Sequence, residues 1–150
     1  QNEETIKTAY AKIISKSELG RVIVRSYIDD VYRYSGSADL VITRAGATNL
    51  AEFAAQGRAC IVIPSPFLAG GHQLKNAQYL EDQQAAVVID ETELVADSNR
   101  LAKQVSDLLN SKERRDQLAR NLSHFAKPNA TSDIAKLIIK ESEIVKHKDR

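Results

Sequence analysis

Short apolar runs rich in β-branched residues alternate with helical patterns along this chain of 150 residues. Each run is largely apolar without clean alternation, which is typical of strands covered on both faces. We expect four such strands, at residues 21–28, 39–43, 59–63 and 85–90. Because strands and helices alternate, the sequence predicts an α/β fold in which a Rossmann-like parallel sheet carries helices on both faces, with residues 1–150 in one domain.

Helical patterns surround the predicted strands, at residues 3–16, 30–34, 49–56, 73–83 and 99–110. After the last strand only amphipathic stripes follow, and we interpret them as a helical cover for the sheet. Their members are Leu101, Val105, Leu108 and Leu109, then Leu118, Leu122 and Phe125, then Ile134, Leu137, Ile138 and Val145. Pro128 separates the last two helices, and Thr131 or Ser132 is the expected cap of the final one.

Charge and composition narrow the class of protein. Lys and Arg number 21 and Asp and Glu number 20, a balance that argues against nucleic acid as a partner. No apolar run approaches the ~20 residues of a membrane-spanning helix. Cys60 lies within an apolar run, so we expect a buried structural thiol and a reducing compartment. The sequence has no Met and starts with Gln1, so we interpret the chain as a fragment, in which no signal peptide can be judged.

The segment after the second predicted strand suits a phosphate. Arg44 and the small residues around Gly46 lead directly into a helix, whose exposed N–H groups and positive dipole end favour an anion. Two plainer alternatives stay open: Gly46 satisfies a tight turn or close packing, and Glu52 closes a capping box with Asn49 as N-cap. The functional alternative for Glu52 is that its two carboxylate oxygens accept from both hydroxyls of a ribose.

The next predicted strand ends in a loop rich in Pro and Gly, which leads into a helix. His72, Gln73 and Asn76 are candidates to meet a polar ligand there, because loops at the carboxyl ends of neighbouring parallel strands converge. The alternative for His72 and Gln73 is a helix cap and surface pair. No His or Cys spacing suggests a metal site, and we expect no metal and no cofactor.

Four separated motifs resemble, in the right order, the donor-binding half of the MurG family in glycosyltransferase family 28. They are Tyr-Ile-Asp-Asp at 27–30, Ala-Asp-Leu-Val-Ile-Thr-Arg-Ala-Gly-Ala at 38–47 followed by Glu52, Pro-Ser-Pro at 64–66, and His-Gln-Leu-Lys-Asn-Ala at 72–77. These bacterial enzymes transfer GlcNAc from UDP-GlcNAc to undecaprenyl-diphosphate-muramoyl-pentapeptide, which converts lipid I to lipid II in peptidoglycan synthesis.

The resemblance implies part of the C-terminal domain of a GT-B glycosyltransferase, without that domain's first strand and glycine-rich phosphate loop. It also implies binding roles for particular residues. Ile28 reads the uracil edge, Arg44 lies by the nucleotide, the helix start at Gly46, Ala47, Thr48 and Asn49 holds the diphosphate, and Glu52 takes the ribose. Gln73, with His72, reaches the sugar, and Asn76 holds the loop or joins them. His72 matches the His-Gln variant of a position that is often a Gln-Gln pair.

The same resemblance implies that the acceptor site and general base belong to an N-terminal domain, so no catalytic residue is expected in this chain. The expected partners are UDP-GlcNAc and, through that other domain, the lipid-linked acceptor, with peripheral membrane contact at the cytoplasmic face of the plasma membrane. Two other hypotheses stay open. The chain is a donor-binding subunit that docks on a partner and has no catalysis of its own, or a regulatory α/β module that has lost the ligand.

Overall fold

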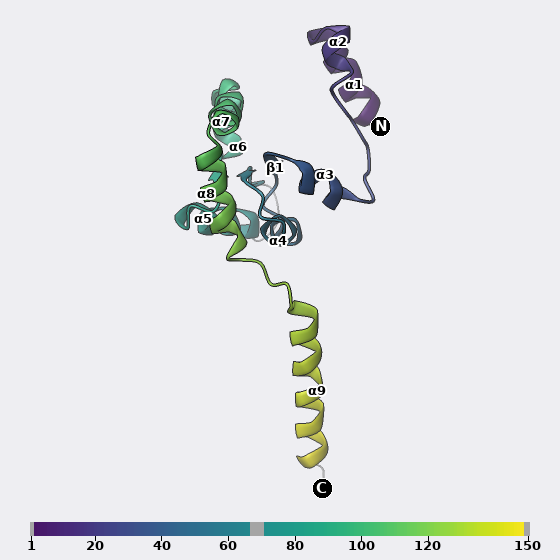
Figure 1. The fold of residues 1–150 in the computed structure, drawn as a ribbon, viewed down its shortest axis with the longest axis vertical. Coiled ribbons are helices and arrows are strands. Elements are labelled where there is room, and N and C mark those ends of the chain that lie inside the picture. The colour runs from purple at the N-terminus through teal and green to yellow at the C-terminus, as the bar shows by residue number, and fades with distance from the viewer. Residues whose placement is uncertain (1, 67–70, 149–150) are drawn as a thin grey trace. The chain divides into compact units, whose positions relative to one another are not determined.

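A computed structural model describes residues 2–66 and 71–148 of the chain (Figure 1), which divides into a unit of residues Gln1–Tyr34 and a unit of residues Ser35–Arg150. The first unit holds α1 (Asn2–Ile13) and α2 (Lys16–Leu19). The Ser15 hydroxyl accepts from the Glu18 N–H, and the Glu18 carboxylate accepts from the Ser15 N–H. This capping box starts α2, so the single helix predicted at 3–16 is in fact interrupted.

The strand predicted at residues 21–28 is wrong. The segment is irregular, and it pairs with no strand among the residues that the structure describes. Two of its N–H groups have acceptors outside any sheet: the Val22 N–H donates to Leu19 O, and the Ser26 N–H donates to the Glu3 carboxylate at 2.9 Å. β-Branched residues favour a strand only where a neighbouring strand takes up the backbone hydrogen bonds.

The second unit contains the parallel sheet that the sequence predicts. Its strands are β1 (Val41–Thr43), β2 (Cys60–Val62) and β3 (Val87–Val88), in the order β1-β2-β3. Both pairings are parallel, with Ile42 opposite Ile61 and Ile61 opposite Val87. The helices that connect them are α4 (Ala47–Ala55) and α5 (His72–Asp82), while α3 (Val31–Ser37) precedes β1.

Helices cover both faces of this sheet, as predicted. Cys60 and Val62 belong to one buried cluster, together with residues of α4 and α5 such as Phe53 and Leu80. Ile61, which points the opposite way along β2, belongs to the other cluster. That cluster also contains Leu108 of α7 (Asn99–Asn110) and Leu118 of α8 (Lys112–Ser123), while α6 (Glu91–Ala96) adds Leu94 at its edge. The Asp90–Glu93 capping box that starts α6 was present in the sequence, but α6 was not predicted.

Helix α4 ends at Ala55, within one residue of the predicted range of 49–56, and the turn that follows at Gly57 has a clear geometric cause. Gly57 has a φ of +59°, its N–H donates to Ala54 O, and the next N–H, of Arg58, donates to Phe53 O. This is the Schellman arrangement, in which a left-handed residue lets the chain turn back on the last carbonyls. A residue with a side chain would be strained at this φ, so glycine is the natural choice.

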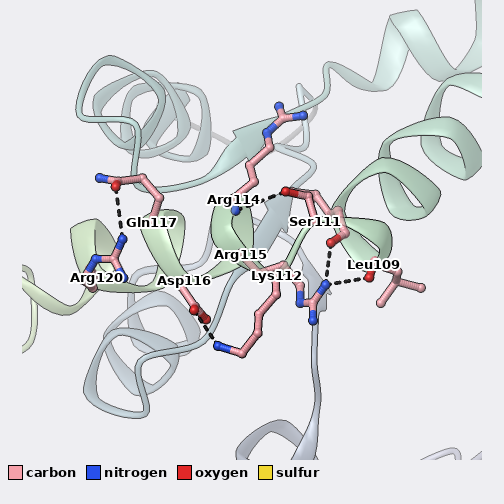
Figure 2. Close-up of polar contacts among 9 residues, drawn as sticks. Leu109, Ser111, Lys112, Arg114, Arg115, Asp116, Gln117 and Arg120 are labelled. Atoms are coloured by element: carbon pink, nitrogen blue, oxygen red, sulfur yellow. Dashed lines mark hydrogen bonds and ion pairs between the residues drawn. The ribbon is translucent and has the colours of Figure 1, made fainter.

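The connection between α7 and α8 is held by polar contacts that Figure 2 shows. The Ser111 hydroxyl accepts from the Arg114 N–H and caps α8, while the Arg115 guanidinium donates to the carbonyls of Leu108 and Leu109 at 2.7 Å each. The last carbonyls of a helix have no N–H donor within it, so a cationic side chain that donates to them satisfies them. These contacts fix the direction of α8 relative to α7. Leu118 of α8 then belongs to the cluster of Ile61, and Leu122 to the cluster of Cys60 and Val62.

The predicted helical cover is confirmed for the first two stripes, apart from Leu109, and is wrong for the third. Leu109 is 49% exposed, and Ile134, Leu137 and Ile138 of α9 (Ala130–Lys148) are between 57% and 63% exposed. Periodicity identifies an apolar face but not what covers it. The side chain of Val145 lies outside the described residues. Because α9 begins at Ala130, Thr131 and Ser132 lie in its first turn and do not precede it as caps.

Cys60 is fully buried in β2, as predicted, and this burial raises the pKa of its thiol to about 12. A thiol with so high a pKa stays protonated near neutrality and behaves as a small apolar side chain. In the described ranges, no helix combines the length and apolar character needed to cross a bilayer.

Candidate functional site

The candidate site lies where the three strands end. In a parallel sheet the carboxyl ends of all strands meet at one edge, so the segments that follow β1, β2 and β3 converge there. A cavity of about 250 Å³ opens among them, lined by Ile42, Thr43, Arg44, Ile63, Glu91 and Leu94. Its charged groups are the Arg44 guanidinium and the Glu91 carboxylate, and the other lining side chains are apolar except for Thr43.

Helix α4 begins two residues earlier than the sequence predicted. Gly46 is its N-cap, with φ −72° and ψ 128°, and no side chain caps the helix. The first intrahelical bond runs from the Leu50 N–H to Gly46 O at 3.0 Å. The N–H groups of Ala47, Thr48 and Asn49 therefore have no acceptor within the helix, and these three residues are exposed. A helix start of this kind suits an anion.

Neither plainer interpretation of Gly46 holds in the structure. Its φ of −72° is one that any residue adopts, so the turn does not require glycine. A Cβ built at Gly46 meets nothing within 4 Å, so packing against the described residues does not require glycine either. A position that tolerates a side chain on both counts, yet carries glycine, leaves room for a ligand to approach the backbone.

The capping-box alternative for Glu52 is wrong. It required Asn49 as the N-cap, but Gly46 occupies that position, so Asn49 is the third residue of α4 and Glu52 the sixth. Glu52 is exposed. It follows Thr48 by four residues, which places the two side chains on the same face of the helix, about one turn apart. The carboxylate therefore lies one turn behind the exposed N–H groups.

Arg44 forms hydrogen bonds that connect the ends of the three strands. It follows β1 directly, one of its η nitrogens donates to Ile63 O at 3.4 Å, and the other donates to Glu91 Oε1 at 2.8 Å. Ile63 follows β2, and Glu91 is the first residue of α6, just beyond β3. The hydrogen bond lowers the pKa of Glu91 below its usual value and raises that of Arg44, so both groups are charged near neutrality.

Side chains of α5 brace the neighbouring loops. The Asn76 amide donates to Ala45 O at 3.1 Å, a contact of the loop-holding kind, and the Gln73 carbonyl accepts from the Ser65 N–H at 3.0 Å. His72 is exposed at the start of α5, directly after Gly71 with φ +61°. The preceding residues 67–70 lie outside the described residues. Within the part that is described, no three His, Cys, Asp or Glu side chains gather in a way that could hold a metal ion.

Comparison with known proteins decides the family of this chain. The family model described as "Glycosyltransferase family 28 C-terminal domain" matches residues 3–138. The chain belongs to glycosyltransferase family 28. The resemblance to the MurG family is thereby confirmed at the level of this domain.

Several relatives of this family 28 domain carry one name, "UDP-N-acetylglucosamine--N-acetylmuramyl-(pentapeptide) pyrophosphoryl-undecaprenol N-acetylglucosamine transferase". The protein of Anaeromyxobacter dehalogenans strain 2CP-C is 41% identical over 112 residues, which cover 75% of this chain and 29% of that protein. The protein of Sorangium cellulosum strain So ce56 is 38% identical over 149 residues, covering 97% and 35%. The family 28 chain thus spans about a third of the length of these relatives.

A solved structure agrees with the fold. The crystal structure of Acinetobacter baumannii MurG matches this family 28 chain with a TM-score of 0.75 and 28% identity, over 93% of this chain and 39% of that one. The parallel sheet covered by helices on both faces therefore has the fold of the C-terminal domain of a GT-B glycosyltransferase.

The structure brings most of the predicted site residues of this family 28 domain to one edge of the sheet. Arg44 and the start of α4 follow β1, and His72, Gln73 and Asn76 open the helix after β2. Ile28 belongs to the other unit, and its role stays a prediction. The sequence analysis did not single out Glu91. Its position directly after the strand predicted at 85–90 could have pointed to it, because residues that follow parallel strands lie at the same edge of the sheet.

Proposed function

We propose that this chain supplies the UDP-GlcNAc-binding part of an enzyme that transfers GlcNAc to undecaprenyl-diphosphate-muramoyl-pentapeptide. The observation that carries the proposal is the start of α4, where an N-cap glycine with open space around it is followed by three exposed residues whose N–H groups have no acceptor within the helix. The printed names of the relatives support the donor and the acceptor.

Each part of the donor has a candidate partner. The N–H groups of Ala47, Thr48 and Asn49 and the positive end of α4 would bind the diphosphate. The Glu52 carboxylate, one turn further along, would accept from the ribose hydroxyls. The sugar would meet His72 and the amide nitrogen of Gln73, whose carbonyl is held by Ser65, and Ile28 would read the uracil edge.

The same groups would assist the transfer. When the sugar leaves, negative charge develops on the departing UDP, and the N-terminus of α4, together with the Arg44 guanidinium at the same edge of the sheet, would stabilise that charge. The acceptor site and the general base would lie in another part of the enzyme. Because the proposed acceptor is lipid-linked, the whole enzyme would work at the cytoplasmic face of the plasma membrane, in peripheral contact with it.

Titration of the full-length enzyme with UDP and ADP tests this function. We expect UDP to bind at least tenfold more tightly, about 1.4 kcal/mol, because the helix start binds either diphosphate and only the base distinguishes them. Isothermal titration calorimetry with UDP, ADP and UDP-GlcNAc measures the difference. Equal affinity would refute the reading of uracil, and no binding of any of the three would refute the donor site.

The Gly46→Ser substitution is expected to weaken UDP binding without lowering the stability of the protein. Gly46 already has the extended backbone of an N-cap, so in Gly46→Ser the new hydroxyl can accept from an N–H of the first turn, and the free energy of unfolding should hold or rise by a few tenths of a kcal/mol. The same hydroxyl competes with the diphosphate, so UDP affinity should fall about tenfold.

Urea denaturation and calorimetry of the Gly46→Ser protein measure the two effects. Gly20→Ser is the matched control, because Gly20 has a φ of −63° and a Cβ there would make only an ordinary contact of 3.8 Å with Ser17 O. The control should bind UDP normally. A Gly46→Ser protein that keeps its UDP affinity would show that the diphosphate does not bind the start of α4.

A further inference from the structure

We propose that Glu91 is a positioning residue, which holds the Arg44 guanidinium across the strand ends so that its remaining donors meet the diphosphate of the donor. This inference rests on the proposed function, because it assigns Arg44 to the nucleotide. Glu91 lies outside all four motifs that pointed to the family.

The geometry leaves Arg44 available to a ligand while fixing its direction. A guanidinium has five N–H donors, and the two bonds of Arg44, to Ile63 O and Glu91 Oε1, leave three for another acceptor. The two bonds use different η nitrogens and reach different elements, so the plane of the group is set by two anchors. The Arg44 side chain is 50% exposed, which leaves it accessible to a ligand.

The way Glu91 is held also points to a role beyond stability. Its Oε1 pairs with Arg44, but its Oε2 is buried and has no hydrogen-bond partner among the described residues. A buried carboxylate oxygen without a partner costs free energy, and a residue chosen for stability alone would avoid it. The partly exposed ion pair between Glu91 and Arg44 contributes too little to the free energy of unfolding to offset this cost.

Apolar side chains border the ion pair on one side. Ile42, Ile63 and Leu94 line the cavity beside it and offer the Arg44 guanidinium no other polar side-chain partner. Without Glu91, the long and flexible Arg44 side chain would keep only the 3.4 Å contact with Ile63 O. Its orientation would then have to be fixed at the moment of binding, which lowers affinity.

A double-mutant cycle on UDP binding by the full-length enzyme tests whether Glu91 acts through Arg44. We expect Glu91→Gln to weaken UDP binding three- to tenfold, and to cause no further loss in the Arg44→Ala background. Glu91→Asp, which keeps the charge, should restore part of the affinity. Equal losses in both backgrounds, or no loss in either, would overturn the proposal.

Glu93→Gln is the matched control, because Glu93 lies on the same short helix and pairs with Arg100 at 3.1 Å. Glutamine can still accept from the Asp90 N–H and preserve the cap of α6. The control should bind UDP like the original protein. If Glu93→Gln loses as much UDP affinity as Glu91→Gln, the loss comes from removing negative charge on α6 in general, and Glu91 has no specific role.

A measurement without nucleotide separates this inference from the proposed function. Nitrogen-15 NMR of the Arg44 side chain should show slow guanidinium rotation in the original protein and in Glu93→Gln, and fast rotation in Glu91→Gln. If UDP does not bind the original protein, the proposed function fails. Unchanged Arg44 signals in Glu91→Gln would show that Glu91 does not position Arg44, whatever UDP does.

Discussion

Replacing Leu108 with alanine is expected to lower the free energy of unfolding by about 2–5 kcal/mol. Leu108 is completely buried in the cluster on the Ile61 face of the sheet, so truncation removes apolar contacts and leaves a cavity between α7, α8 and β2. Urea denaturation monitored by circular dichroism measures the loss, with the slope of the transition checked for two-state behaviour.

Leu109→Ala is the matched control for this effect. Leu109 is the next residue on the same helix, has the same side chain and the same helix propensity, but is 49% exposed. We expect a loss below about 1 kcal/mol, because much of its surface already faces water. Similar losses for the two leucines would mean that the packing of α7 differs from that in the structure.

Glu52→Gln is expected to lower the affinity of the full-length enzyme for UDP-GlcNAc by about 1.5–3 kcal/mol, the range for hydrogen bonds to a charged group. The glutamine has one carbonyl oxygen for the two ribose hydroxyls and lacks the charge that strengthens such bonds. Thermal stability should not change, because Glu52 is exposed and is too far along α4 to cap it. Calorimetry and a thermal melt measure the two quantities.

The ribose assignment has its own controls. A 2′-deoxy donor should lose much less affinity on the Glu52→Gln substitution, because one of the two hydroxyl partners is already absent. Glu81→Gln, which changes an exposed glutamate on α5, should leave UDP-GlcNAc binding unaltered. If Glu52→Gln binds the donor as tightly as the original protein, Glu52 does not bind the ribose.

Local patterns in the sequence were sufficient for much of the fold. The runs that contain Val41, Ile61 and Val87 are strands of one parallel sheet, and Gly57 ends α4, because strand composition and the left-handed glycine act over a few residues. The run at 21–28 has the same composition but forms no strand among the described residues. A strand needs a partner for its backbone, and composition does not supply one.

The candidate site shows the same division. Sequence motifs identified Arg44, Gly46 and Asn76 as candidate site residues, because a motif is defined by residue type and spacing. The motifs did not decide between a structural and a binding role for Gly46 and Glu52. That choice depended on where α4 begins and on the space around its N-cap. Helix starts vary by a few residues for a given periodicity, so only the folded backbone decided that Glu52 does not cap the helix.

By itself, the sequence determined the α/β class, the parallel sheet, the buried Cys60 and the segment that suits a phosphate. Only the tertiary structure decided that Leu108 is buried while Leu109 is exposed, and that the stripe on α9 does not cover the sheet. It also paired Arg44 with Glu91, 47 residues further along the chain. The physical reason is that periodicity acts within one element, whereas such a pair exists only because β1 and β3 flank β2 and end at the same edge.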